Sequence, residues 1–122
     1  MSTSTMRMSE AMRLGAMMAP PIHGALFSRD NGPCQACAIG AALLAVWGET
    51  EAKRQIDLCC YIDCAAELWP WLDHTTVVNP VDNSRLPLIG RADMVGIIVV
   101  LFENRDWTRE RIADWLETVE PE

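Results

Sequence analysis

The sequence predicts a mainly α-helical single domain, a compact bundle of about five helices around a central apolar helix at residues 34–47. Residues 36–46 are almost entirely apolar, so a helix there would be buried on all sides. Near both ends of the chain, apolar residues recur at the three- and four-residue spacing of amphipathic helices. Proline and glycine separate these segments, and 122 residues suffice for one domain with its own core.

The first expected helix spans residues 5–19 and ends at Pro20-Pro21. Six of the seven methionines lie within the first eighteen residues. Their flexible, polarizable side chains suit an adaptable contact surface, so Met8 and Met12 are candidate interaction residues. Packing in the core is the favoured alternative, because helical apolar stripes usually face a core.

The central helix, residues 34–47, is expected to be closed by Gly48. A third helix then runs from residue 51 to 69, where Pro70 ends it. Trp69 and Trp71 flank this proline, and an exposed pair of indoles would form a hot spot for a protein partner. We therefore include both as candidate interaction residues, with core or rim packing as the alternative.

In the second half of the chain, residues 75–78 and 86–89 can pair as a short β-hairpin around a turn at 82–84. Residues 92–102 are ambiguous, because their β-branched residues favour a strand whereas their apolar stripe favours a helix. We predict the helix. A final helix is capped by Thr108. Its expected inner face consists of Ile112, Trp115, Leu116 and Val119.

The charge of the chain argues against two classes of partner. Ten basic residues face seventeen acidic ones, for a net charge of −7, which leaves no basic stripe for nucleic acid or anionic membranes. The first thirteen residues lack the apolar core of a secretory signal, and the apolar run 36–47 is about eight residues short of a bilayer span. We expect a cytoplasmic protein that binds a protein partner or self-associates.

The five cysteines are the main candidates for chemistry. An odd number in the cytoplasm favours free thiols over a disulfide framework. Cys34 and Cys37 lie one turn apart at a helix N-terminus, where the helix dipole and free amides can stabilise a thiolate. This pattern suggests a redox pair, although a thioredoxin-like site would also need a strand before the motif.

Zinc is the one cofactor that the sequence suggests. Cys34, Cys37, Cys60 and Cys64 can supply four thiolates if the second and third helices are neighbours, with Cys59 or His74 as substitutes. Otherwise we expect no cofactor. The plain alternative is that the cysteines are small buried hydrophobes.

Residues 32–38 loosely resemble the nucleophile segment of papain-like proteases, in which a cysteine opens a buried helix. The resemblance implies Cys37 as nucleophile, His74 as base, and Asp73 or Asn79 as the residue that orients the base. Only seven residues match, the aromatic residue expected after the nucleophile is absent, and papain-like enzymes are far longer.

A second likeness covers more of the chain. The helix beginning Cys37-Ala38-Ile39-Gly40-Ala41-Ala42-Leu43 resembles the Cys-Ala-Leu-Gly-Ala-Leu helix of a family of small bacterial and phage proteins of unknown function. That family has a later helix ending in Trp-Asn-Asp and a short final helix. Here Phe102 replaces the tryptophan and Glu103-Asn104 replaces Asn-Asp, so this motif is degenerate. The resemblance implies helices at 92–103 and carries no activity.

These patterns together favour a non-enzymatic binding or regulatory module. The alternative is a thiol protein that uses Cys34 and Cys37 for zinc binding or redox chemistry. A cysteine hydrolase with Cys37 and His74 is the least favoured of the three.

Overall fold

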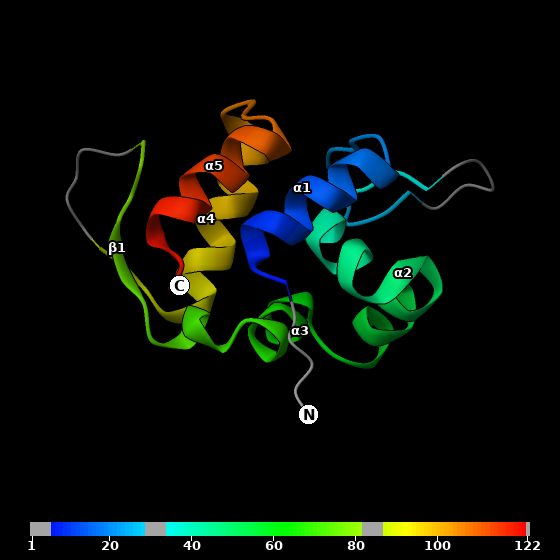
Figure 1. Ribbon diagram of the computed structural model, residues 1–122, viewed down its shortest axis with the longest axis horizontal. Helices are drawn as coiled ribbons and strands as arrows, with labels where there is room; N and C mark the ends of the chain where they lie inside the picture. Colours follow the sequence, from blue (N-terminus) through cyan, green and yellow to red (C-terminus); the bar gives the residue numbers. More distant parts are fainter. Residues whose placement is uncertain (1–5, 29–33, 82–86, 122) are drawn as a thin grey trace.

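Residues 6–28, 34–81 and 87–121 are described by the computed structural model of the chain. Five α-helices, one 3-10 helix and a two-stranded antiparallel sheet make up this part of the chain (Figure 1). In chain order they are α1 (Met8–Met18), α2 (Ala38–Leu58), α3 (Tyr61–Leu68), η1 (Pro70–Asp73), β1 (Thr76–Val78), β2 (Pro87–Ile89), α4 (Gly90–Asn104) and α5 (Arg109–Val119). The predicted mainly helical class is confirmed. None of the helices in these ranges combines the length and apolarity needed to cross a bilayer.

The first half of α2 is buried and carries small residues where other segments cross it. Every residue from 38 to 44 is buried. A Cβ atom at Gly15 of α1 would lie 1.8 Å from the carbonyl oxygen of Ala41, so only glycine fits at this crossing. On another side, a Cβ atom at Gly40 would lie 2.3 Å from the carbonyl oxygen of Leu26. Small residues thus let α1 and the loop after it pack directly against α2.

The start of α2 differs from the prediction, which placed it at residue 34. The helix begins at Ala38, and Cys37 is its N-cap. The segment before it is extended, since the Ala36 N–H donates to the carbonyl oxygen of Pro20 at 2.9 Å and the Cys37 N–H donates to that of Leu26 at 3.1 Å. Hydrogen bonds to the loop after α1 therefore delay the helix.

The prediction of one continuous helix over residues 51–69 is wrong. Gly48 breaks the regular helix as expected, with φ 80° and ψ 168°, but helical structure resumes and α2 extends to Leu58. The backbone is then extended at Cys59 and Cys60, and α3 is a separate helix. The break lets α3 turn and pack against α4 and η1. No proline or glycine marks it in the sequence.

The second half of the chain follows the prediction closely. Strands β1 and β2 pair antiparallel, with Val77 opposite Leu88; the expected turn at 82–84 and residue 86 lie outside the described residues. Residues 92–102 belong to helix α4, as predicted. The residues of its apolar stripe are all buried: Met94, Ile97, Ile98, Leu101 and Phe102. The Thr108 hydroxyl oxygen accepts the Arg111 N–H at 3.0 Å, which confirms the predicted cap of α5.

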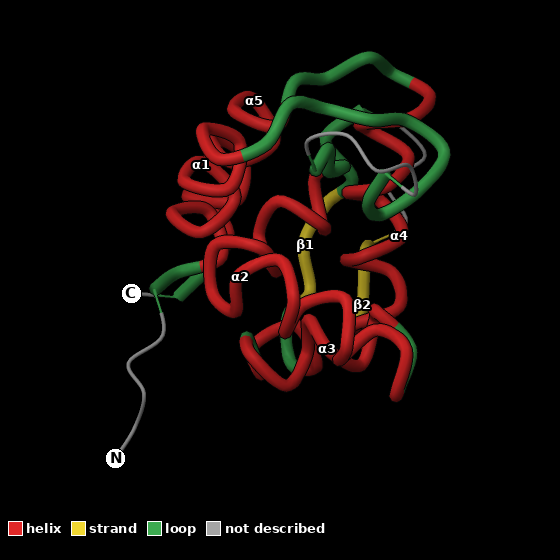
Figure 2. Tube along the Cα trace, turned by 90° about the vertical axis from the view of Figure 1, so that its right-hand side faces the viewer, coloured by secondary structure: helices red, strands yellow, loops and turns green. Residues whose placement is uncertain are grey.

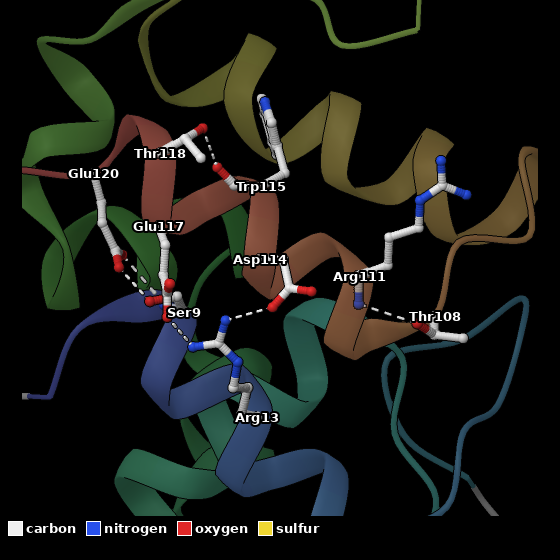
Figure 3. A network of polar contacts seen from close by, with 9 residues as sticks. All are labelled: Ser9, Arg13, Thr108, Arg111, Asp114, Trp115, Glu117, Thr118 and Glu120. Atoms are coloured by element: carbon white, nitrogen blue, oxygen red, sulfur yellow. Dashed lines mark hydrogen bonds and ion pairs between the residues drawn. The ribbon is translucent and has the colours of Figure 1, made fainter.

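Helix α5 lies beside α1, as both views of the molecule show (Figures 1 and 2). Arg13 of α1 bridges Asp114, at 2.6 Å, and Glu117 of α5 (Figure 3). The buried Glu120 carboxylate accepts hydrogen bonds from the Ser9 hydroxyl and, at 3.2 Å, from the Ser9 N–H. Because the first N–H groups of a helix lack partners within it, Glu120 caps α1 from the far end of the sequence.

A buried arginine ties three segments together. Arg109, at the start of α5, is 5% exposed. Its guanidinium donates to the carbonyl oxygens of Ala19 at 2.7 Å, Ala36 at 3.2 Å and Ala16 at 3.3 Å. It therefore satisfies carbonyl groups at the end of α1 and in the extended segment before α2.

The predicted contact role of the methionines is wrong for the two residues that we named. Met8 and Met12 are completely buried in the core, which confirms the packing alternative for them. The methionines of α1 that reach solvent are instead Met17 and Met18, which are 84% and 52% exposed.

The tryptophan pair is also not an exposed hot spot. Trp69 is buried, and its indole Nε1 donates to the carbonyl oxygen of Met6 at 2.9 Å. Trp71 is half-buried and packs against the core. Contacts within the chain therefore cover most of the surface that was predicted to bind a protein partner.

The helix crossing gives a stability prediction. Gly15→Ala should destabilise the chain by about 3 kcal/mol or more, because the new methyl overlaps the α2 backbone, which cannot yield as a side chain can. Gly96→Ala is the matched control: Gly96 lies within α4, and a Cβ there meets nothing within 4 Å. It should stabilise by about 0.5–1 kcal/mol. Urea denaturation measures both, and equal effects would contradict the tight crossing.

Arg109→Met should cost about 3 kcal/mol, because it removes the buried donor of the Ala19 and Ala16 carbonyl oxygens, whereas that of Ala36 keeps the Ile22 N–H. Arg111→Met, two residues along the same helix, removes an exposed guanidinium that lies 4.0 Å from the Trp107 ring. This control should cost about 0.5–1 kcal/mol. Thermal unfolding of the two variants checks the difference, and a mild effect of Arg109→Met would show that its carbonyl partners are otherwise satisfied.

Candidate functional site: a pocket at the start of the central helix

A pocket of about 450 Å³ lies where α2 begins, between the loop after α1, the start of α3 and the last turns of α4. This volume falls within the range of small-molecule sites. Its lining consists of Gly24, Ala25, Leu26, Cys37, Ala38, Ile39, Tyr61, Val99, Phe102, Glu103 and Asn104. We call it the α2–α4 pocket.

The loop that forms one wall of this pocket is fixed to α4. Both carboxylate oxygens of Glu103 accept the Gly24 N–H, at 2.8 and 3.0 Å. Gly24 has φ 85°, a conformation that favours glycine. Beside it, the His23 ring stacks on Phe102 with centroids 4.3 Å apart and planes 7° from parallel. These contacts hold this wall of the pocket against α4.

Cys37 lies in the lining and is the N-cap of α2. Its Sγ accepts the Gly40 N–H at 3.4 Å, as expected of sulfur at a helix N-terminus. Burial nevertheless raises the pKa of the Cys37 thiol, outweighing the hydrogen bonds from Gly40 and Ile39 that lower it. Burial, followed by the nearby charge of Glu49, also raises the pKa of Cys34. A redox pair needs a thiol with a lowered pKa, whereas the pKa values of Cys34 and Cys37 are both raised.

The four cysteines proposed as zinc ligands do not form a cluster. Within the described ranges, no group of three or more His, Cys, Asp or Glu side chains is placed to hold a metal ion. Cys64 is buried, whereas Cys60 is exposed. The unbroken helix predicted from the sequence would have put both on one face, whereas here Cys60 is the N-cap of α3 and differs from Cys64 in exposure. The neighbour of Cys64 is instead Cys59, with 3.3 Å between the sulfur atoms.

The residues of the hydrolase alternative are also not assembled. His74 is exposed beyond η1 and does not line the pocket that contains Cys37. The Asp73 carboxylate binds Arg91 through two hydrogen bonds of 2.5 and 2.7 Å. The Asn79 amide oxygen accepts the Val81 N–H at 2.9 Å. The hydrogen bond and then the charge of Arg91 lower the pKa of Asp73, and the charge of His74 is the last of the causes that lower it.

Sequence reasoning identified Cys37 but missed the other walls of the pocket. Tyr61 comes from α3, whereas Val99 and Glu103 lie one turn apart on α4, and no sequence spacing relates these two helices to Cys37. In the sequence, the Glu103-Asn104 pair stands out only as the degenerate part of a family motif. An acidic residue at the end of an apolar helix was the one available signal for Glu103.

Comparisons with protein-family models, with curated proteins and with solved structures gave no match to this chain. The family resemblance inferred from the sequence therefore stays an expectation, and the function has to be inferred from the site itself.

Thiol reactivity tests this description of the cysteines. In the native chain at about pH 8, the exposed Cys59 and Cys60 should react with Ellman's reagent first. Cys37 and Cys64 should react slowly because both are buried, and burial, with Cys59 as a neighbour, raises the pKa of Cys64 from 9.0 to about 12. That shift means roughly a thousandfold less thiolate. All five thiols should react fast in denaturant, and uniform fast reaction of the native chain would contradict the burial.

Proposed function

We propose that this chain is a non-enzymatic binding module that holds a small, mainly apolar molecule in the α2–α4 pocket. The observation that carries the proposal is the pocket itself, about 450 Å³ with a mostly apolar lining and a few polar groups. This combination is typical of ligand sites, in which apolar surface supplies affinity and isolated polar groups set orientation.

The charge in the pocket favours one class of ligand. Of the described residues that line it, Glu103 is acidic and none is Lys, Arg or His. An anionic ligand would meet the Glu103 carboxylate without a compensating cation. A neutral or cationic apolar molecule is therefore favoured over an anion.

The state of Cys37 supports binding rather than catalysis. Burial raises the pKa of its thiol, so the nucleophilic thiolate is disfavoured at neutral pH. The pocket lining also offers no imidazole that would serve as a base, as judged from the described residues. Zinc or redox chemistry at Cys34 and Cys37 is the less favoured alternative, because neither thiol is activated.

The neutral dye N-phenyl-1-naphthylamine tests the pocket, since its fluorescence rises in apolar surroundings. We expect saturable binding to the native chain. Val99→Phe should weaken it about tenfold or more, because Val99 lines the pocket and the larger ring fills it. Val100→Phe is the matched control, since Val100 is the next residue of α4 and is not in the lining. Its affinity should stay within about twofold.

Two results would contradict the proposal: no saturable binding by the native chain, or equal weakening by the two variants. Thermal unfolding of both variants separates a filled pocket from a damaged fold.

Self-association is the second candidate, favoured by the exposure of apolar side chains on α1. Leu14, Met17 and Met18 are 40%, 84% and 52% exposed. Such a surface suits a contact with another chain, since methionine adapts to its partner. Light scattering after size exclusion should give a mass above one chain at high concentration, and Met17→Glu should lower it. A strictly monomeric native chain would remove this candidate.

A further inference from the structure

The junction between α2 and α3 brings two thiols together. Cys59 is the C-cap of α2 and is exposed, whereas Cys64 lies buried in α3. Their Sγ atoms are 3.3 Å apart, and both lie near the carbonyl oxygen of Gln55, at 3.8 and 3.6 Å. Residues five apart lie on different faces of a continuous helix, so the extended backbone at the junction creates this pair.

We propose that Cys59 and Cys64 form a reversible disulfide site, which small organic disulfides oxidise by thiol–disulfide exchange. Cys59 is the attacking thiol because it is exposed, and Cys64 is the resolving thiol because it is already in contact with Cys59. Neither cysteine lines the α2–α4 pocket, so a test of this disulfide is independent of the proposal that the pocket binds a ligand.

The disulfide forms in two successive exchange steps. The Cys59 thiolate attacks one sulfur of the small disulfide, forms a mixed disulfide with it and releases the other half, which takes up a proton as a thiol. The Cys64 sulfur, after losing its proton, attacks the Cys59 sulfur and releases the second half, again as a thiol. Two cysteine thiols become one disulfide, and the small disulfide is reduced to two thiols.

Cys60 is the competing partner, and geometry argues against it. Adjacent residues joined by a trans peptide have Cα atoms about 3.8 Å apart, below the roughly 4.4–6.8 Å usual for a disulfide. Cys60 also begins α3 as its N-cap and is exposed. The position across the junction, five residues on, is therefore preferred over the adjacent one.

The environment of Cys64 sets the pH dependence of the second step. Burial, followed by the hydrogen bond with Cys59, raises the pKa of Cys64 to about 12. Between neutral pH and this pKa, its thiolate fraction rises about tenfold per pH unit. In the mixed disulfide Cys59 is no longer a thiol, so its contribution to the raised pKa of Cys64 is lost, while burial and the nearby charge of Glu67 still oppose ionisation. Closure of the disulfide from the mixed intermediate should therefore still accelerate with pH.

Mass spectrometry of the full chain after incubation with bis(2-hydroxyethyl) disulfide, an uncharged probe, tests the site. Endoprotease cleavage before Asp57 and Asp63 separates peptide 57–62, with Cys59 and Cys60, from peptide 63–72, with Cys64. We expect these peptides to be joined, at a mass lower by two hydrogen atoms than their sum. Dithiothreitol should separate them again.

Three variants decide which sulfurs are joined. Cys60→Ser should still give the linked peptides, whereas Cys59→Ser should reduce their yield at least about tenfold. Cys64→Ser should stop at the mixed disulfide on Cys59. Because Cys64 is buried, that variant risks misfolding, and the exposed Cys59→Ser then decides the outcome together with Cys60→Ser. Unlinked peptides from the native chain, or linked peptides that survive Cys59→Ser, would overturn the proposal.

Discussion

The approach of α1 to α2 at Gly15 and Ala41 is the contact on which the rest of the structure depends. A helix pair this close removes the space for a side chain at the crossing, so the two backbones are in direct contact. The loop after α1 must then double back along α2, where Gly40 accommodates the Leu26 carbonyl. Because the loop after α1 runs back along α2, it pairs with the extended segment before α2, and its residues 24–26 line the α2–α4 pocket.

Polar groups far apart in the sequence hold the two ends of this arrangement. Glu120 caps the first turn of α1, and Arg109 satisfies carbonyl groups at its other end. Both side chains are buried and both belong to the last part of the chain. Since unpaired groups at helix ends are costly when buried, α1 and α5 stabilise one another through these contacts as well as through their apolar faces.

Burial decides the chemistry of the cysteines more than the helix dipole does. Cys37 receives a hydrogen bond at a helix N-terminus, the setting of reactive thiols, yet desolvation raises its pKa. Burial also raises the pKa of Cys64, whose exposed neighbour Cys59 is the accessible thiol of that pair. Of the two cysteines of the C-x-x-C motif, Cys37 lines the α2–α4 pocket and Cys34 does not, whereas the two thiols in contact lie at the break between α2 and α3.

The sequence by itself determined the helical class, the hairpin, the helical state of α4 and the cap at Thr108, because apolar periodicity and local hydrogen bonding act over a few residues. It did not determine the start of α2, where backbone hydrogen bonds to the loop after α1 overrode helix propensity. It also did not determine the break at Cys59 and Cys60, which no proline or glycine marks. Tertiary structure alone decided which methionines face the core, and it joined Val99 and Glu103 to Cys37 in one pocket. Those outcomes depend on how helices cross, which no local pattern encodes.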